Sequence, residues 1–160
     1  MHGSEIYSLL LFILQDDKKA VGALDFIFDL GKKQGRKSQH KPWVVRTDVP
    51  DINSDPAHDK VACENAAPVL FLYFDAASVF QGAVICADNN KMILTSCVSN
   101  AVLCYVSLFH VCQVGYNDGW LHFLNTLEHL LLGLDYKPAA KYTPIRLEKF
   151  INTFKVAEKE

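Results

Sequence analysis

The segment from residue 67 to residue 116 constrains the fold most, because it combines short apolar runs with a long uncharged stretch. Its first run, residues 69–74, is rich in β-branched and aromatic residues and is bounded by a proline and an aspartate, which is typical of a buried strand. Residues 79–87 and 92–94 are two further strand candidates. The asparagines between them tolerate the positive φ of a tight turn. We therefore expect a small antiparallel β meander of about three strands.

A long helix without a charged side chain is predicted over residues 98–112, where apolar residues recur at helical spacing. Its length raises the possibility of a membrane span, for which about 20 apolar residues suffice. Against this, Asn100, His110 and Gln113 would have to lie in lipid, and a hairpin directly upstream has no place there. We expect a helix that is buried in protein on several sides, and no membrane partner.

The amino-terminal residues 1–35 are expected to form a helical hairpin. The apolar run at residues 6–14 lacks the basic leader of a signal peptide, so it is interpreted as a first helix. A second helix follows, with apolar residues on one face. Its alternative start and end signals are Asp16 or Asp17 and Gly31 or Gly35.

Two carboxy-terminal helices are expected. The first begins near Trp120 and ends at Gly133, and its polar face carries His122 and His129, which we expect to be solvated. A metal would need a third ligand that the nearby sequence does not offer. The second helix starts at a Thr-Pro pair, residues 143–144, and packs by one apolar face.

Size and composition fit one domain of residues 1–160, with half of the residues hydrophobic and a formal net charge of −2. The expected parts are the helical hairpin at 1–35, a charged loop region at 36–66, and a core with the carboxy-terminal helices at 67–160. The fold class is therefore α+β. Five cysteines without a CxxC pair are expected to be free thiols in a reducing compartment, so the protein is expected to be intracellular, in the nucleus or cytoplasm.

Residues 32–46 are the most basic segment, with six of the sixteen Lys and Arg residues and no carboxylate. Basic residues beside an aromatic ring can pair with phosphates and stack on a base, although a solvated connecting loop is the alternative interpretation. Binding of nucleic acid should then weaken steeply with salt, because each neutralised phosphate releases counterions. The candidate nucleic-acid-binding residues are Lys32, Lys33, Arg36, Lys37, Lys41, Trp43 and Arg46.

The acidic loop that follows imitates the first three ligands of a calcium loop with Asp51, Asn53 and Asp55. The imitation fails at its sixth position, where Pro56 replaces the required glycine, and at its twelfth, where Ala62 replaces a bidentate glutamate. We expect a solvated loop that faces the basic one and holds no metal.

A strand that ends in Asp75, followed by a hairpin and a helix, resembles the start of a ribonuclease-H-like nuclease. A two-metal site needs further carboxylates that hold metals about 4 Å apart. The long helix has none, and Glu128 is the only acid of the next helix. Nucleophile and phosphate-loop motifs are also absent from the sequence. We therefore assign no catalytic residue, metal or cofactor.

The order of the apolar segments between Trp43 and Gly133 resembles a group of fish and invertebrate proteins associated with transposable elements or with sterile-alpha-motif proteins. The similarity lies in VVRTDVP at 44–50, APVLFL at 67–72, SVFQGAVI at 78–85, NAVLCY at 100–105, FHV at 109–111, Tyr116 and WLHFL at 120–124. The resemblance implies an intracellular carboxy-terminal accessory domain with no established enzymatic activity. It carries over no functional residue.

The sequence is therefore compatible with three functions. The leading hypothesis is a non-catalytic, intracellular protein-interaction or oligomerisation domain of an element-derived protein, because the residues build core and caps and no polar constellation converges in the sequence. The alternative is a nucleic-acid-binding accessory domain that uses residues 32–46. A ribonuclease-H-like nuclease is the third.

Overall fold

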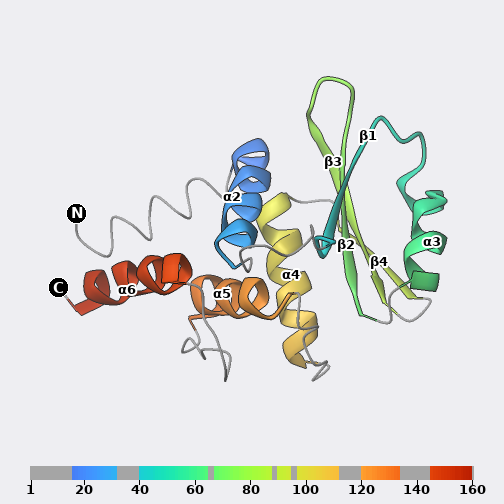
Figure 1. Ribbon diagram of the computed structural model, residues 1–160. Coiled ribbons are helices and arrows are strands. Elements are labelled where there is room, and N and C mark those ends of the chain that lie inside the picture. Colours follow the sequence, from blue (N-terminus) through green and yellow to red (C-terminus); the bar gives the residue numbers. More distant parts are fainter. Residues whose placement is uncertain are drawn as a thin grey trace. The chain divides into compact units, whose positions relative to one another are not determined.

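The computed structural model describes residues 16–31, 40–64, 67–87, 90–94, 97–111, 120–133 and 145–159. The chain divides into two compact units, each described by itself. One, the helical unit, comprises Met1–His40 and Asp118–Glu160, and the other, the sheet unit, comprises Lys41–Asn117. Helices and a mixed sheet confirm the predicted α+β class (Figure 1). The prediction of a single domain stays a prediction.

The sheet unit is built on four strands rather than the expected three. They are β1 (Trp43–Thr47), β2 (Val69–Phe74), β3 (Phe80–Ala87) and β4 (Asn90–Leu94), in the spatial order β1-β2-β3-β4. The last three form the predicted antiparallel meander, whereas β1 pairs in parallel with β2. The sheet is therefore mixed.

The additional strand corrects the prediction of a charged loop region at residues 36–66. This segment contains β1, the 3-10 helix η1 (Ile52–Ser54) and the helix α3 (Ala57–Glu64). The strand escaped prediction because it is short and lies beside a basic stretch, and because its partner follows more than twenty residues later. A crossover of that length is what a parallel pair of strands requires.

Both faces of the sheet are covered in the sheet unit. All six residues of β2 are buried. On one face, η1 and α3 pack against β3, and on the other, the helix α4 (Val98–Val111) packs against β2 and β3 (Figure 1). A hydrogen bond of 2.7 Å from the Tyr105 hydroxyl to the Pro68 carbonyl joins α4 to the start of β2.

The predicted long helix is confirmed as α4, but one side of it is exposed. Six of its residues are buried, whereas Leu103 is 37% and Val111 77% exposed. The expectation of burial on several sides is thus too strong for these positions. None of the helices in the described part of the chain is long and apolar enough to span a membrane.

The helical unit contains the helices α2 (Asp17–Leu30), α5 (Leu121–Leu132) and α6 (Ile145–Lys159). Asp16 caps α2 by accepting hydrogen bonds from two backbone N–H groups, and Gly31 ends the helix, as predicted. Edge-to-face contacts join Phe28 to Phe123 and Phe26 to Phe150, with ring centroids 5.7 and 5.9 Å apart. The expected first helix of the hairpin, at residues 6–14, lies outside the described residues.

The carboxy-terminal helices confirm two sequence signals and correct a third. Gly133 ends α5 in the left-handed conformation, and Leu147 and Ile151 of α6 are buried as expected. His122 and His129, however, are 8% and 7% exposed rather than solvated. Part of the reason is visible at the end of α2, where a Cβ added to Gly31 would lie 3.0 Å from the His122 Cβ. The polar side of α5 is thus also a packing surface.

Two glycines in different surroundings give a matched pair of substitutions. Gly82 has a φ of +156°, and an added Cβ would lie 3.0 Å from the Ile52 side chain and 3.2 Å from the Leu94 carbonyl oxygen. Gly22 lies inside α2 with open space around it. We expect Gly82→Ala to lower the free energy of unfolding by about 2 kcal/mol and Gly22→Ala to raise it by about 0.5–1 kcal/mol. Urea unfolding measures both changes in the free energy of unfolding. Equal changes for the two substitutions would contradict the conclusion that Gly82 has no room for a side chain.

Candidate functional site

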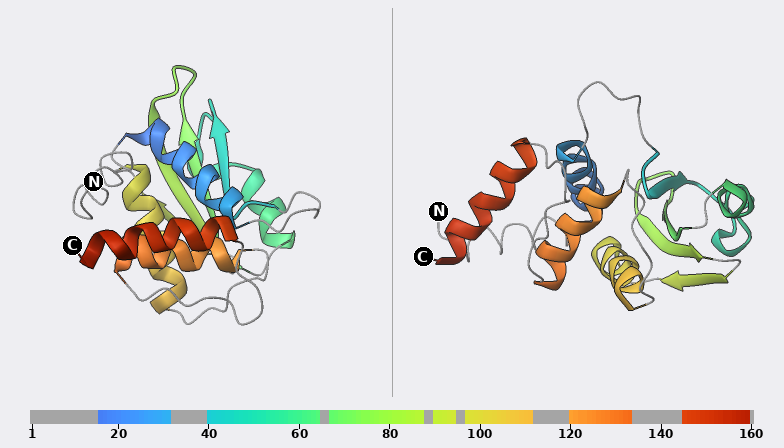
Figure 2. Two further views of the ribbon diagram at one scale, coloured as in Figure 1. Left: turned by 60° about the vertical axis from the view of Figure 1, so that its left-hand side comes forward. Right: turned by 60° about the horizontal axis from the view of Figure 1, so that its bottom comes forward.

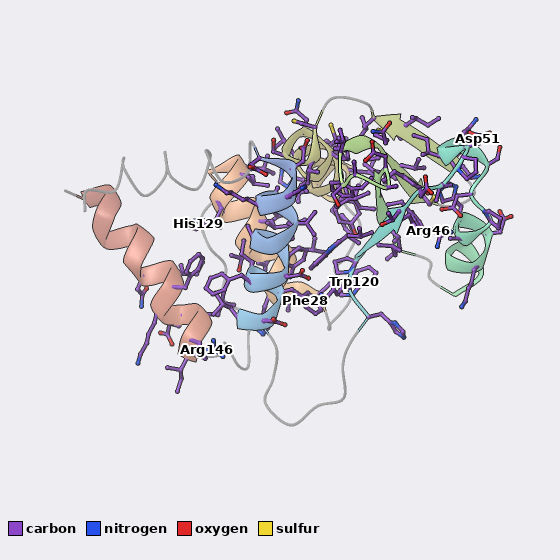
Figure 3. All side chains as sticks on the ribbon, turned by 90° about the horizontal axis from the view of Figure 1, so that it is seen from above. Phe28, Arg46, Asp51, Trp120, His129 and Arg146 are labelled. Atoms are coloured by element: carbon purple, nitrogen blue, oxygen red, sulfur yellow. The ribbon has the colours of Figure 1, made fainter. Side chains whose placement is uncertain are left out.

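Four polar side chains converge on the face of the sheet that carries η1 and α3. Arg46 of β1 and Tyr73 of β2 are direct neighbours in the parallel register, so their side chains leave the same face. Asp55 and His58 come from the crossover that joins these two strands. Figure 3, in which Arg46 is labelled, shows this side chain between β1 and α3. We call these four residues the Asp55 cluster.

The carboxylate of Asp55 is the centre of the cluster. Its Oδ2 accepts hydrogen bonds of 2.9 Å from the Arg46 Nε and 2.9 Å from the Tyr73 hydroxyl. Its Oδ1 accepts bonds of 3.1 Å from the Arg46 Nη2 and 3.0 Å from the Ala57 backbone N–H. The Asp55 side chain is fully buried, whereas the Arg46 side chain is 41% exposed. Four donors therefore occupy the four lone-pair positions of a buried carboxylate.

The direction of these bonds also assigns the tautomer of His58. The Tyr73 hydroxyl donates to Asp55, so it accepts from the His58 Nε2, which must carry a hydrogen. In the neutral ring, the Nδ1 of His58 is then an acceptor, and it is buried without a hydrogen-bond partner among the described residues. Phe71 holds the ring edge-to-face, with centroids 4.7 Å apart. A proton added to Nδ1 would therefore have no hydrogen-bond acceptor among the described residues.

The cluster shifts several pKa values. Burial raises the pKa of Asp55, but the hydrogen bonds from Arg46, Ala57 and Tyr73 outweigh burial and hold it at about 2. Burial, together with the hydrogen bond to Asp55, raises the pKa of the Tyr73 hydroxyl. Burial and then the charge of Lys91 lower the pKa of His58. At neutral pH the cluster thus consists of an Arg–Asp ion pair, a neutral tyrosine and a neutral histidine.

These protonation states and contacts define what the cluster can do. A general base or a metal ligand needs a lone pair that faces the reactant, and the described donors already occupy those of Asp55. The Tyr73 hydroxyl both donates and accepts within the cluster. The arrangement instead ties the crossover to β1 and β2 and opposes a slip of their register, since a shift by one residue would turn Arg46 to the other face.

The predicted nucleic-acid-binding residues are only partly brought together. Lys41 is exposed, and its Nζ lies 5.3 Å from the centroid of the Trp43 ring. Trp43, the predicted stacking platform, is itself 5% exposed, and Arg46 is bound to Asp55. The other candidates, Lys32, Lys33, Arg36 and Lys37, lie outside the described residues. Binding of nucleic acid by this segment stays a prediction.

The acidic residues singled out in the sequence have local structural partners. Asp51 caps η1 by accepting from the Asn53 N–H, while Asp55 is buried, which corrects the expectation of a fully solvated loop. Asp75, the first carboxylate of the nuclease hypothesis, accepts from the backbone N–H groups of Ala77 and Val79 and from Gln81. In the described residues no group of three or more His, Cys, Asp or Glu side chains is arranged to hold a metal ion.

The outer edge of the sheet is the second feature of interest. Four of the five residues of β4 are exposed, and Met92 and Ile93, whose side chains leave opposite faces, are each 45% exposed. Among the described strands only β3 pairs with β4. The right-hand view of Figure 2 shows β4 at one border of the sheet and β1 at the other. Such an edge presents backbone N–H and C=O groups that can pair with a further strand.

Comparisons with protein-family models, with curated proteins and with solved structures found no match to this chain. The resemblance described above therefore stays an expectation.

No pattern in the sequence singled out His58 or Tyr73. Tyr73 lies in an apolar run and is indistinguishable there from a core aromatic residue, and His58 is a single histidine in a polar segment. One signal was present: the alternation of Val44, Val45 and Arg46 matches a strand with one polar residue on its covered face. A partly buried arginine at such a position favours a carboxylate nearby.

Proposed function

We propose that this chain is a non-catalytic protein-interaction or oligomerisation domain and that it associates through the outer edge of β4. The observation that carries the proposal is the exposure of four of the five residues of β4, with an apolar side chain 45% exposed on either face. Large exposed apolar side chains next to open backbone groups favour the addition of a strand from a partner.

The Asp55 cluster supports the non-catalytic part of the proposal. Its buried carboxylate has its acceptor positions filled by Arg46, Tyr73 and the Ala57 N–H, so this polar cluster is suited to holding the fold together. The cysteines Cys86, Cys97 and Cys104 are free thiols. Free thiols are typical of a reducing, intracellular compartment, which is where we place the protein.

The proposal is tested by Met92→Asp, which adds a charge at the centre of the edge. Val79→Asp is the matched control, because Val79 is 55% exposed in the same unit but lies outside β4. Sedimentation velocity of the purified protein and mass spectrometry of complexes cross-linked in cells measure the association. We expect complexes with the wild type and with Val79→Asp, and their loss with Met92→Asp. A wild type that forms no complex in either experiment, or a Met92→Asp variant that retains all of them, would contradict the proposal.

A further inference from the structure

We infer that protonation of His58 releases the helix α3 from the sheet, so that the crossover between β1 and β2 acts as a pH-sensitive flap. The released state is a local opening in which the sheet and α4 keep their structure. The inference is independent of the association proposed for β4. It is argued from the burial of His58, from the occupied acceptors around it, and from the way in which α3 is anchored.

The first argument is that α3 attaches to the sheet through a titratable ring. Among the side chains of α3 that the structure describes, that of His58 is 1% exposed, whereas Asp59 and Lys60 are exposed. The His58 ring packs edge-to-face on Phe71, and its Nε2 donates to the Tyr73 hydroxyl. Docking of α3 on the sheet therefore buries an imidazole whose charge changes near neutral pH.

The second argument is that the closed structure has no acceptor for a second ring proton. The Nδ1 of His58 is buried without a hydrogen-bond partner among the described residues. The carboxylate of Asp55 already accepts four hydrogen bonds, so it has no lone pair left for an imidazolium. A buried cation without a partner is costly, and opening of α3 would return the ring to water.

Charged or titratable groups reach the surroundings of His58 from the crossover and from every strand of the sheet. They are Arg46 of β1, Asp55 and Asp59 of the crossover, Tyr73 of β2, Cys86 of β3 and Lys91 of β4. Tyr73 and Cys86 are neutral, since burial raises the pKa of each. Lys91 and Arg46 oppose protonation, whereas the two aspartates favour it, but burial is the largest effect and lowers the pKa of His58 in the closed structure.

The third argument is that α3 can open while the sheet stays intact. The start of α3 is anchored by the Asp55 carboxylate, which accepts from the Ala57 N–H and is paired with Arg46 and Tyr73. This anchor does not involve the His58 ring, so it can serve as the hinge. A helix of eight residues is marginal in water by itself. Once released, α3 therefore loses its helical hydrogen bonds, whereas β2 keeps its pairing with β1 and β3.

Amide hydrogen exchange of the full chain, followed by mass spectrometry, measures this opening. After correction for the intrinsic pH dependence of exchange, the protection of the α3 amides should fall several-fold between about pH 7.5 and pH 5, and at most about thirtyfold. This limit follows because the ring in the open state takes up its proton at the ordinary pKa of about 6.5. The β2 amides should keep their protection. In His58→Phe, the protection of α3 should not change with pH.

Lys91→Gln is a second variant, which changes an exposed side chain and keeps the test decisive if circular dichroism shows that His58→Phe is not folded. It removes a charge that opposes protonation, so its α3 protection should fall less than that of the wild type. An equal loss of protection in α3 and β2 would overturn the local opening. An unchanged α3 in the wild type, or the same loss in the wild type and both variants, would overturn the role of His58.

Discussion

Asp55→Asn is expected to lower the free energy of unfolding by about 1–3 kcal/mol, the range found when buried hydrogen-bonding groups are left without a partner. The amide has nearly the shape of the carboxylate, so little packing is lost. The NH₂ group of the asparagine, however, replaces one carboxylate oxygen and cannot accept a hydrogen bond. The donors that faced this oxygen, from Arg46 and from Tyr73 or the Ala57 N–H, are then left without an acceptor. Urea unfolding followed by circular dichroism measures the change.

Asp51→Asn is the control for this substitution. Asp51 belongs to the same crossover, is exposed, and accepts one hydrogen bond, from the Asn53 N–H. Asparagine is an equally good cap, so we expect a change within about 0.5 kcal/mol. If Asp55→Asn were as mild as Asp51→Asn, the Asp55 cluster would not be what holds the crossover to the sheet.

Acid is expected to destabilise the protein in two ranges, and the Asp55 cluster contributes to both. The pKa of Asp55 is depressed to about 2 in the folded protein. Its stabilising effect is thus fully present above the unfolded pKa of about 4 and is lost as the pH falls through the folded value. We expect about 2 kcal/mol of stability to be lost in this way between about pH 4 and pH 2. The Asp55→Asn variant has no carboxylate that titrates at this position. The difference in the free energy of unfolding between wild type and variant should therefore be about 2 kcal/mol smaller at pH 2 than at pH 4.

His58 contributes to the loss of stability in the higher of the two pH ranges. Its pKa is lowered by burial and by Lys91, so the folded protein favours the neutral ring. Stability is then fully present above the unfolded pKa of about 6.5 and declines as the pH falls below it, because the unfolded chain takes up the proton first. His58→Phe keeps an aromatic ring against Phe71 and removes the titrating group. The free energy of unfolding of His58→Phe should fall less than that of the wild type between about pH 7 and pH 5. Equal slopes of the free energy of unfolding against pH in the two proteins would contradict the assignment of this pH dependence to His58.

The comparison of variants over pH separates His58 from the other buried histidines. His122 and His129 belong to the helical unit and are unchanged in His58→Phe, so they do not contribute to a difference between the two proteins. The Asp55→Asn variant likewise leaves His58 in place. Thermal or urea unfolding of the wild type and the two variants across the pH range therefore measures the loss of stability in each of the two ranges.

Much of the fold was predictable because it depends on local patterns. The continuous apolar run of β2, the helical periodicity of α4 and α6, the Asp16 cap and the Gly133 end of α5 each have a signal within a few neighbouring residues. The candidate site was not predictable in this way. Arg46 and Tyr73 are 27 positions apart, and they become neighbours only through the parallel register of β1 and β2.

The sequence by itself determined the α+β class, the meander, most helix positions and the absence of a familiar catalytic motif, since these follow from hydrophobic spacing and residue type. The tertiary structure alone decided which charged residues pair with one another and which residues are buried. It bound Arg46 to Asp55, buried Trp43, His122 and His129, and left β4 at an exposed edge. The physical reason is that burial and pairing are properties of the assembled layers, which join segments whose spacing along the chain carries no signal.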